Sequence, residues 1–194
     1  MREHNVPKWY IDSCMKIKYM FPKAHATAYM ISTLRLGWYK VHKPLEYYAA
    51  YFTVRGEDFD GALVMKGKQA VKDKMAEIFE KGKEASAKEH ALYATLQIIN
   101  EMLERKIEIL PVDIYKSDAY KYLVEDGKIR LPFSSLGGIG ENAAKCLADA
   151  GKKGQYISIE DLQNRASASK SIVEALEEIG ALDGIPKTSQ ISFF

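Results

Sequence analysis

The spacing of apolar residues along this 194-residue chain predicts a protein built mainly from α-helices. In most segments apolar side chains return every three or four positions, which places them on one face of a helix. Proline and glycine separate these segments, because proline cannot continue a helix and glycine readily ends one. The expected helices run from Pro7 to about Phe21, over 24–42, 45–54, 59–67, 68–81 and 85–105, directly after Gly140, and over 158–165 and 169–179.

The pattern changes in the middle of the chain, where short extended segments replace the helices. A short strand is expected within residues 107–113, followed by two strands over 120–124 and 128–131 around the turn residues Glu125-Asp126-Gly127. Such a turn between two apolar segments is typical of a β-hairpin. The expected parts are a helical region (1–106), a connecting strand and hairpin segment (107–133), a second helical domain (134–184) and an extended tail (185–194).

Residues 134–148 carry the most specific motif, Ser-Ser-Leu-Gly-Gly-Ile-Gly-Glu-Asn-Ala-Ala-Lys-Cys-Leu-Ala. An apolar residue, a glycine–apolar–glycine turn and an alanine-rich helix are the pattern of a helix-hairpin-helix. Glycine allows a tight turn, and its bare backbone lets amides approach a phosphate at the next helix's N-terminus. We therefore expect this loop to bind the backbone of duplex DNA without reading its bases. The residues assigned to this contact are Gly138, Ile139, Gly140, Asn142 and Lys145.

Two alternatives accompany this motif. The glycine turn could be a purely structural corner between helices. The unit at 169–180 lacks a glycine–X–glycine turn, and it is either a degenerate second hairpin or, as we favour, packing support for the first.

Composition adds a charge asymmetry and excludes some classes of protein. Residues 1–66 hold ten Lys and Arg against six Asp and Glu, whereas residues 67–194 hold eighteen against twenty. The basic part is thus far in sequence from the glycine motif, which suggests two separate phosphate-facing surfaces. Cys14 and Cys146 lack metal-site spacing, so we expect reduced, buried thiols and no metal site. Because neither a long apolar run nor a signal peptide is present, we expect a soluble, intracellular protein and no membrane partner.

A second candidate site lies at the start of the second expected helix. Lys23 precedes it, His25 falls in its first turn, and Arg35 follows about 15 Å further along the axis on nearly the same azimuth. These three side chains could form a basic strip for a triphosphate or a nucleic-acid strand.

Two other patterns have a structural interpretation that we prefer. Asp58-Phe59-Asp60 resembles a magnesium-binding carboxylate pair, but flanking glycines favour a turn or helix cap. Tyr47, Tyr48, Tyr51 and Phe52 share one helical face, where core packing is favoured over stacking on bases.

The chain ends in Gln190-Ile191-Ser192-Phe193-Phe194, which places large apolar side chains on a terminus. Such residues usually insert into a pocket of another surface. We prefer a peptide anchor here, and the alternative is a tail folded back on its own domain.

Together these residues resemble the C-terminal part of PolC-type DNA polymerase III alpha subunits, replicative polymerases of the C family. The resemblance covers nearly the whole chain. It includes Val6–Cys14, Tyr19–Ala26, Val41–Leu45, Tyr48–Asp60, Leu131–Leu136 with the glycine hairpin, Ser158–Gln163 and the tail.

The resemblance implies a mainly α fold, in which a helical distal fingers subdomain precedes a short β-hairpin and a helix-hairpin-helix DNA-binding subdomain. Lys23, His25 and Arg35 would then lie near the incoming nucleotide's phosphates, and residues 134–184 would hold the primer–template duplex. The tail resembles a sliding-clamp-binding peptide of the form Gln-Leu-Ser/Asp-Leu-Phe, with Ile191 and Phe193 replacing the leucines. Gln190, Ile191, Phe193 and Phe194 are the expected clamp contacts.

The family's palm, with its metal-binding aspartates, has no counterpart in this sequence. We therefore expect no catalytic residue and no cofactor in the chain itself, with Mg²⁺ required by the full polymerase. The chain resembles a fragment or a separately encoded remnant, inactive alone, with the rest of the polymerase as a partner and a cytoplasmic, nucleoid-associated location. Alternatives are a stand-alone, non-enzymatic accessory protein that binds DNA and the clamp, and a purely structural interaction domain.

Overall fold

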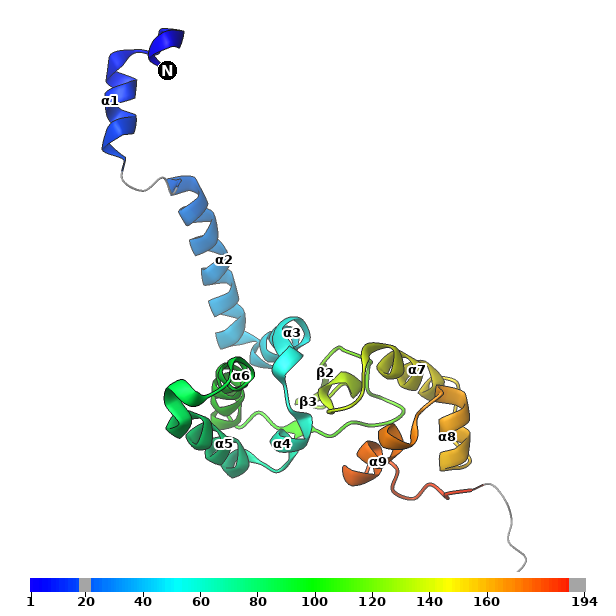
Figure 1. Cartoon of the computed structure of the whole chain (residues 1–194). Coiled ribbons are helices and arrows are strands. Elements are labelled where there is room, and N and C mark those ends of the chain that lie inside the picture. The colour runs from blue at the N-terminus through cyan, green and yellow to red at the C-terminus, as the bar shows by residue number, and fades with distance from the viewer. Residues whose placement is uncertain (18–21, 189–194) are drawn as a thin grey trace, which may run out of the picture. The chain divides into compact units, whose positions relative to one another are not determined.

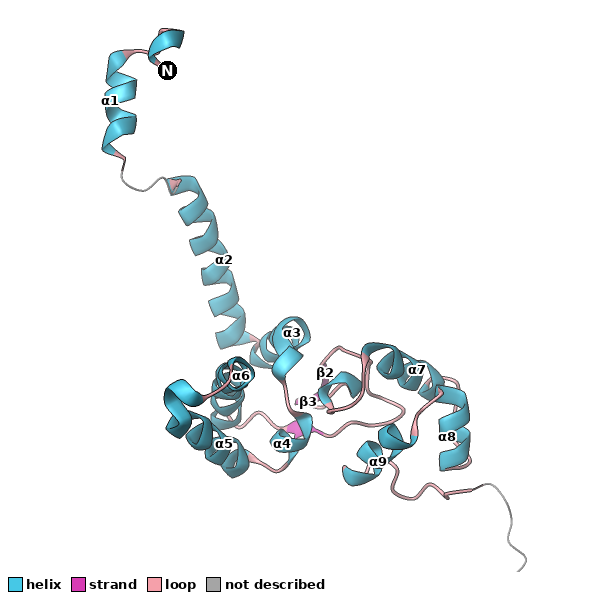
Figure 2. Ribbon diagram, viewed as in Figure 1, coloured by secondary structure: helices cyan, strands magenta, loops and turns pink. Residues whose placement is uncertain are grey.

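The computed structural model describes residues 1–17 and 22–188 and is mainly helical (Figure 1). The chain divides into two compact units, Met1–His42 and Lys43–Phe194. Helices dominate both units, and the strands are confined to the middle of the second (Figure 2). The expected fold class, mainly α with a short β-hairpin, is confirmed.

The first unit contains the short 3-10 helix η1 (Arg2–His4), α1 (Lys8–Lys16) and the long α2 (Lys23–His42). Pro7 is the N-cap of α1, so the helix begins one residue later than expected. None of the described residues of these helices is buried. Large apolar side chains of α2 are exposed instead: Tyr29, Met30, Ile31, Leu34, Leu36, Trp38, Tyr39 and Val41.

The second unit begins with helices that the sequence pattern placed well. These are α3 (Pro44–Arg55), α4 (Gly61–Met65), α5 (Lys68–Lys81) and α6 (Ala87–Glu104). Pro44 starts α3 because its fixed φ suits a first helical position. Ser86 and Glu89 form a capping box that starts α6, with each side chain bonded to the other's backbone amide.

Aromatic side chains form the part of the core beneath α3. Tyr48 and Phe52 are fully buried, which confirms that this helical face packs in the core. The ring of Phe52 lies 5.0 Å from that of Phe59 and 5.6 Å from that of Tyr122, between centroids. The amide of Tyr122 also donates to Thr53 Oγ1 at 3.1 Å. The segment that leads into the sheet is therefore hydrogen-bonded to α3.

The sheet has three short strands, β1 (Ile109–Leu110), β2 (Leu123–Glu125) and β3 (Lys128–Arg130), in the order β1-β3-β2. β3 pairs antiparallel with β2 and parallel with β1. Asp126 and Gly127, between β2 and β3, have φ values of 49° and 76°. Positive φ at both central residues is the geometry of a two-residue hairpin turn, so the expected hairpin is confirmed.

A partly buried ion pair holds this sheet to the segment that follows β1. The Arg130 guanidinium donates to both carboxylate oxygens of Glu125, at 2.7 and 2.9 Å, and to the Pro111 carbonyl at 2.8 Å. Lys116 also donates to Glu125, at 2.9 Å. Arg130 and then Lys116 lower the pKa of Glu125 to about 2. One carboxylate thus joins β2, β3 and the segment after β1.

Three helices complete the second unit: α7 (Glu141–Gly151), α8 (Ile159–Ala166) and α9 (Lys170–Glu178). Arg165 of α8 donates to the carbonyls of Ala150 and Gly154, and its guanidinium lies 4.4 Å from the centre of the Tyr156 ring. This arginine therefore donates to one carbonyl in the last turn of α7 and to another just after the helix. Together with the cation–π contact it fixes the turn between α7 and α8.

One hydrophobic cluster includes buried residues from Tyr48 to Leu182. Its members come from the helices that precede the sheet in the chain and from those that follow it. Residues 43–106 therefore share a core with the glycine-motif region, whereas the sequence pattern grouped them with residues 1–42. The expectation of two buried thiols is wrong, because Cys146 is exposed and Cys14 half-buried. Cys146 faces away from the core, while Ala144, Leu147 and Ala148 occupy the buried face of α7.

We expect Gly151→Ala to destabilise the second unit by about 1–3 kcal/mol. A Cβ at this buried position of α7 would overlap the Ile114 carbonyl oxygen, so helix and loop would have to separate. Thermal and urea unfolding measure the loss. Gly137→Ala is the control, since no atom lies within 4 Å of its Cβ position; equal stability of the two variants would contradict the close approach.

The Glu125 site predicts an acid-dependent contribution to stability. Because the folded pKa lies near 2 and the ordinary value is 4.5, the ion pair stabilises the fold above about pH 4.5. The contribution is lost as the pH falls toward 2. Glu125→Gln should therefore lower the free energy of unfolding at neutral pH, and its difference from the wild type should shrink across that window.

Unfolding curves between pH 7 and 2 measure this difference. Glu108→Gln serves as the control, because its pairing with Lys128 is exposed and such pairs contribute little. A Glu125→Gln deficit that stayed constant with pH would show that the charge of Glu125 is unimportant.

Candidate nucleic-acid interface

The glycine motif forms an exposed loop that leads directly into α7. Gly138 has a φ of +85°, which a residue with a side chain rarely adopts, and Gly140 is the N-cap of the helix. No atom lies within 4 Å of the Cβ position at Gly137, Gly138 or Gly140. The three glycines thus present bare backbone to open space.

Two apolar side chains anchor this loop from below. Leu136 and Ile139 are only 4% and 7% exposed. The Ile139 amide donates to the Leu136 carbonyl at 3.3 Å, and the Ala144 amide donates to the Gly140 carbonyl at 2.9 Å to begin α7. The apolar residue between the glycines therefore fixes the loop, and this explains the alternation of glycine and isoleucine in the sequence.

The first turn of α7 offers backbone donors to a ligand. Gly140 has no side chain that could cap the helix, so the first amides of α7 are left to solvent or to a bound anion. Asn142 is exposed in this turn. The partial positive charge of a helix N-terminus favours an anion such as a phosphate at this position.

A lysine and a tyrosine flank the same turn. Lys145 Nζ lies 5.4 Å from the centre of the Tyr120 ring, and the Tyr120 hydroxyl donates to the Glu141 carbonyl at 2.7 Å. The structure therefore brings together all five residues assigned to this site from sequence. It adds Tyr120, which no motif indicated because it lies 18 residues before Gly138.

The element before the hairpin differs from a full helix-hairpin-helix. The turn is preceded by η4 (Phe133–Ser135), a 3-10 helix of three residues. A short 3-10 helix therefore stands where the first α-helix of the motif would be. Pro132 and Gly137 explain the difference. Proline lacks an amide donor, and the residues between it and Gly137 are enough for only one helical turn.

The unit at 169–180 supports the core, as we expected. Its helix α9 starts at the N-cap Ser169 and buries Ile172, Val173 and Leu176. Gly180, with a φ of +73°, follows the helix in the position expected for a terminating glycine.

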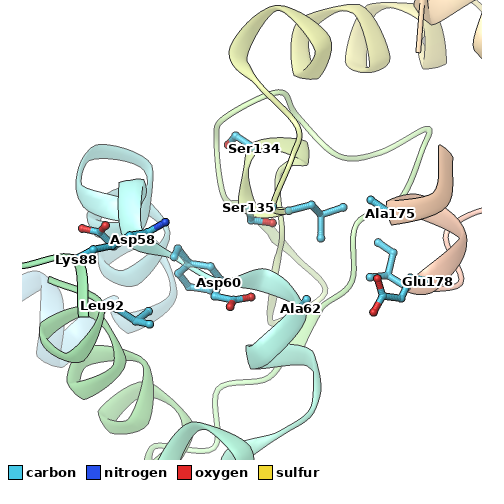
Figure 3. Close-up of a pocket in the computed structure, with 13 residues that line it drawn as sticks. Asp58, Asp60, Ala62, Lys88, Leu92, Ser134, Ser135, Ala175 and Glu178 are labelled. Carbon is cyan, nitrogen blue, oxygen red and sulfur yellow. The ribbon is translucent and has the colours of Figure 1, made fainter. Parts of the chain in front are cut away.

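A cavity of about 410 Å³ lies beside the hairpin in the same unit (Figure 3). Residues from η2 (Gly56–Asp58), the start of α4, α6, α9 and the segment before the glycine loop line it, among them Asp58, Asp60, Lys88, Ser134, Ser135 and Glu178. Asp60 caps α4 by accepting the Leu63 amide at 2.9 Å, which confirms the helix-cap interpretation. In residues 1–17 and 22–188, no three His, Cys, Asp or Glu side chains gather as a metal ion would require.

The residues assigned to nucleotide phosphates lie on α2 in the first unit. Lys23, His25 and Arg35 are all exposed, and the His25 ring packs edge-on against Tyr29 at 4.5 Å between centroids. Ten residues of a continuous helix turn through about 1000°, so His25 and Arg35 differ by about 80° around the axis. The expectation that they share an azimuth is wrong, and they do not form one straight strip.

The four clamp-contact residues, Gln190, Ile191, Phe193 and Phe194, lie outside the described residues. The chain before them is held at the start of α8. The amide of Ile159 donates to the Pro186 carbonyl at 2.8 Å, and Thr188 Oγ1 donates to Glu160 at 2.9 Å. Over the described part of the chain, every helix is too short or too polar to cross a membrane.

Comparison with known proteins supports the interpretation of the hairpin. Residues 106–190 match the family described as the helix-hairpin-helix motif. This range includes the sheet, the glycine loop and the last three helices.

Longer relatives match the whole chain. It is 47% identical over 194 residues to a DNA polymerase III PolC-type of Clostridium perfringens and 50% identical over 196 residues to that of Lacticaseibacillus paracasei. The corresponding protein of Caldanaerobacter subterraneus is 45% identical. All of this chain is covered, but it spans only 13% or 14% of the relatives' length. The chain therefore belongs to the PolC-type DNA polymerase III family, as the counterpart of a segment of these longer proteins.

Proposed function

We propose that this chain is the part of a replicative DNA polymerase that holds the primer–template duplex. The observation that carries the proposal is the exposed glycine backbone at the uncapped start of α7, fixed from below by Leu136 and Ile139. Phosphodiester oxygens accept hydrogen bonds from such amides, and Lys145 adds a positive charge one turn further along. These contacts are independent of base identity, as a polymerase that copies any sequence requires.

The first unit would join the chain to the rest of the polymerase. Leu34 is 69% exposed and Trp38 is 53% exposed, although both are large apolar side chains of α2. A helix that is apolar on several faces is normally buried in a larger protein. In that setting Lys23, His25 and Arg35 would approach the incoming nucleotide's phosphates.

The remaining functions belong to the tail and to the rest of the protein. Gln190, Ile191, Phe193 and Phe194 would enter a pocket of the sliding clamp and so keep the polymerase near its template through a high effective concentration. Mg²⁺ would be held by the rest of the polymerase, where it neutralises charge on the reacting phosphates. The isolated chain would then bind DNA in the cytoplasm without polymerising it.

We expect Gly140→Asp to weaken duplex binding at least about tenfold while the fold is preserved. Aspartate is a favourable N-cap, and the backbone of Gly140 has an ordinary negative φ with open space at its Cβ position. Its carboxylate would occupy the amides and repel phosphate. Fluorescence anisotropy with a labelled duplex measures binding, and thermal unfolding checks the fold.

Ser169→Asp is the matched control, because it places the same charge at the N-cap of α9. It should bind the duplex almost as the wild type does. A folded Gly140→Asp variant with wild-type affinity would exclude the hairpin as the DNA contact.

The tail assignment predicts that removal of residues 189–194 abolishes capture by an immobilised sliding clamp. Replacing Phe194 by Ala should weaken capture because a buried aromatic anchor is lost. Lys187→Ala, just before the tail, is the control for a nonspecific charge effect. Equal capture of the full and shortened chains would remove the clamp from the proposed partners.

A further inference from the structure

We infer that Tyr120, which precedes Gly138 by 18 residues, positions Lys145 for its contact with a DNA phosphate. The inference rests on the proposed function and adds a residue from outside the glycine motif. Tyr120 would be a positioning residue, acting through the lysine and through the first turn of α7.

Two separate contacts join Tyr120 to α7. Its hydroxyl donates to the Glu141 carbonyl at 2.7 Å, and its ring lies beneath Lys145 Nζ at 5.4 Å from the ring centre. In an α-helix the Glu141 carbonyl also accepts the amide of the residue four positions later, which is Lys145. The tyrosine therefore contacts both the main-chain partner and the side-chain charge of the same lysine.

The segment that carries Tyr120 is itself well fixed. Asp118 Oδ1 accepts the amides of Tyr120 and Lys121, each at 2.9 Å. The Asp118 carbonyl accepts the Phe133 amide at 3.1 Å, and the Ala119 carbonyl accepts the Ser134 amide at 3.0 Å. The residues just before Tyr120 are thus hydrogen-bonded to the residues that lead into the glycine loop, and these bonds fix the position of the tyrosine.

The charge of Asp118 supports this arrangement. Burial acts to raise the pKa of Asp118, but the amides of Lys121 and Tyr120 outweigh it and hold the pKa below its ordinary value. The carboxylate therefore stays ionised and keeps accepting both amides near neutral pH.

The ring suits a lysine that must remain available to a phosphate. Within the described chain, Lys145 forms no ion pair with a carboxylate, so its contact with the Tyr120 ring is the interaction that restrains it. An aromatic face attracts an ammonium group without accepting strong hydrogen bonds from it. The N–H donors of Lys145 thus stay available, whereas a carboxylate partner would compete with the phosphate.

The test uses the full chain and a labelled duplex, with affinity measured over a series of salt concentrations. Removing one phosphate contact lowers the slope of log K against log salt by about 0.9, so Lys145→Met should show this change. Tyr120→Leu should weaken binding about 2- to 5-fold, the range expected for an exposed cation–π contact, and reduce the slope in the same direction. Tyr120→Phe preserves the ring and should keep most of the slope.

The double variant Tyr120→Leu/Lys145→Met decides whether the two residues act together. We expect it to bind no more weakly than Lys145→Met alone. Lys83→Met, on the turn between α5 and α6, controls for loss of one positive charge, and thermal unfolding controls for the fold.

Three results would overturn the inference. An additive double variant would show that Tyr120 acts independently of the lysine. Binding that is weakened by Lys145→Met but not by Tyr120→Leu would refute the positioning role alone and leave the hairpin's DNA contact intact. Wild-type chain that shows no salt-dependent duplex binding would overturn the proposed function and this inference together.

Discussion

The close packing of α7 against the segment at 114–120 is the constraint on which the candidate interface depends. At the C-terminal end of the helix, Gly151 lies against the Ile114 carbonyl, where no Cβ would fit. At the N-terminal end, Tyr120 bonds to Glu141. Because the helix is fixed at both ends, its first turn and the glycine loop before it have a defined direction, with the bare amides outward.

The sheet and its ion pair hold that segment in place. Arg130 and Glu125 join β2 and β3 to the Pro111 carbonyl, while Ser117 donates to the Leu131 carbonyl at 2.7 Å. The buried Arg130 guanidinium is tolerated here because each of its three nitrogens donates a hydrogen bond. The strands are too short to be stable alone, so their role is to connect the aromatic core under α3 with the hairpin.

Helical periodicity predicted the helices of the second unit closely because each of them buries one apolar face. The Asp126-Gly127 turn was predictable because few residues tolerate positive φ. The same reasoning failed where long-range packing decides. It grouped residues 43–106 with the first unit, although their aromatic side chains pack against Tyr122. It also gave His25 and Arg35 a common azimuth that the helix geometry does not allow.

The family, the helical plan and the glycine loop can be identified without a structure, since they depend on local periodicity and on residues with special backbone freedom. The folded chain was needed to show that Leu136 and Ile139 anchor the loop and that Tyr120 lies beneath Lys145. It was also needed to show that a single 3-10 turn precedes the glycine loop. These contacts join residues whose separation in sequence carries no period, so only packing brings them within bonding distance.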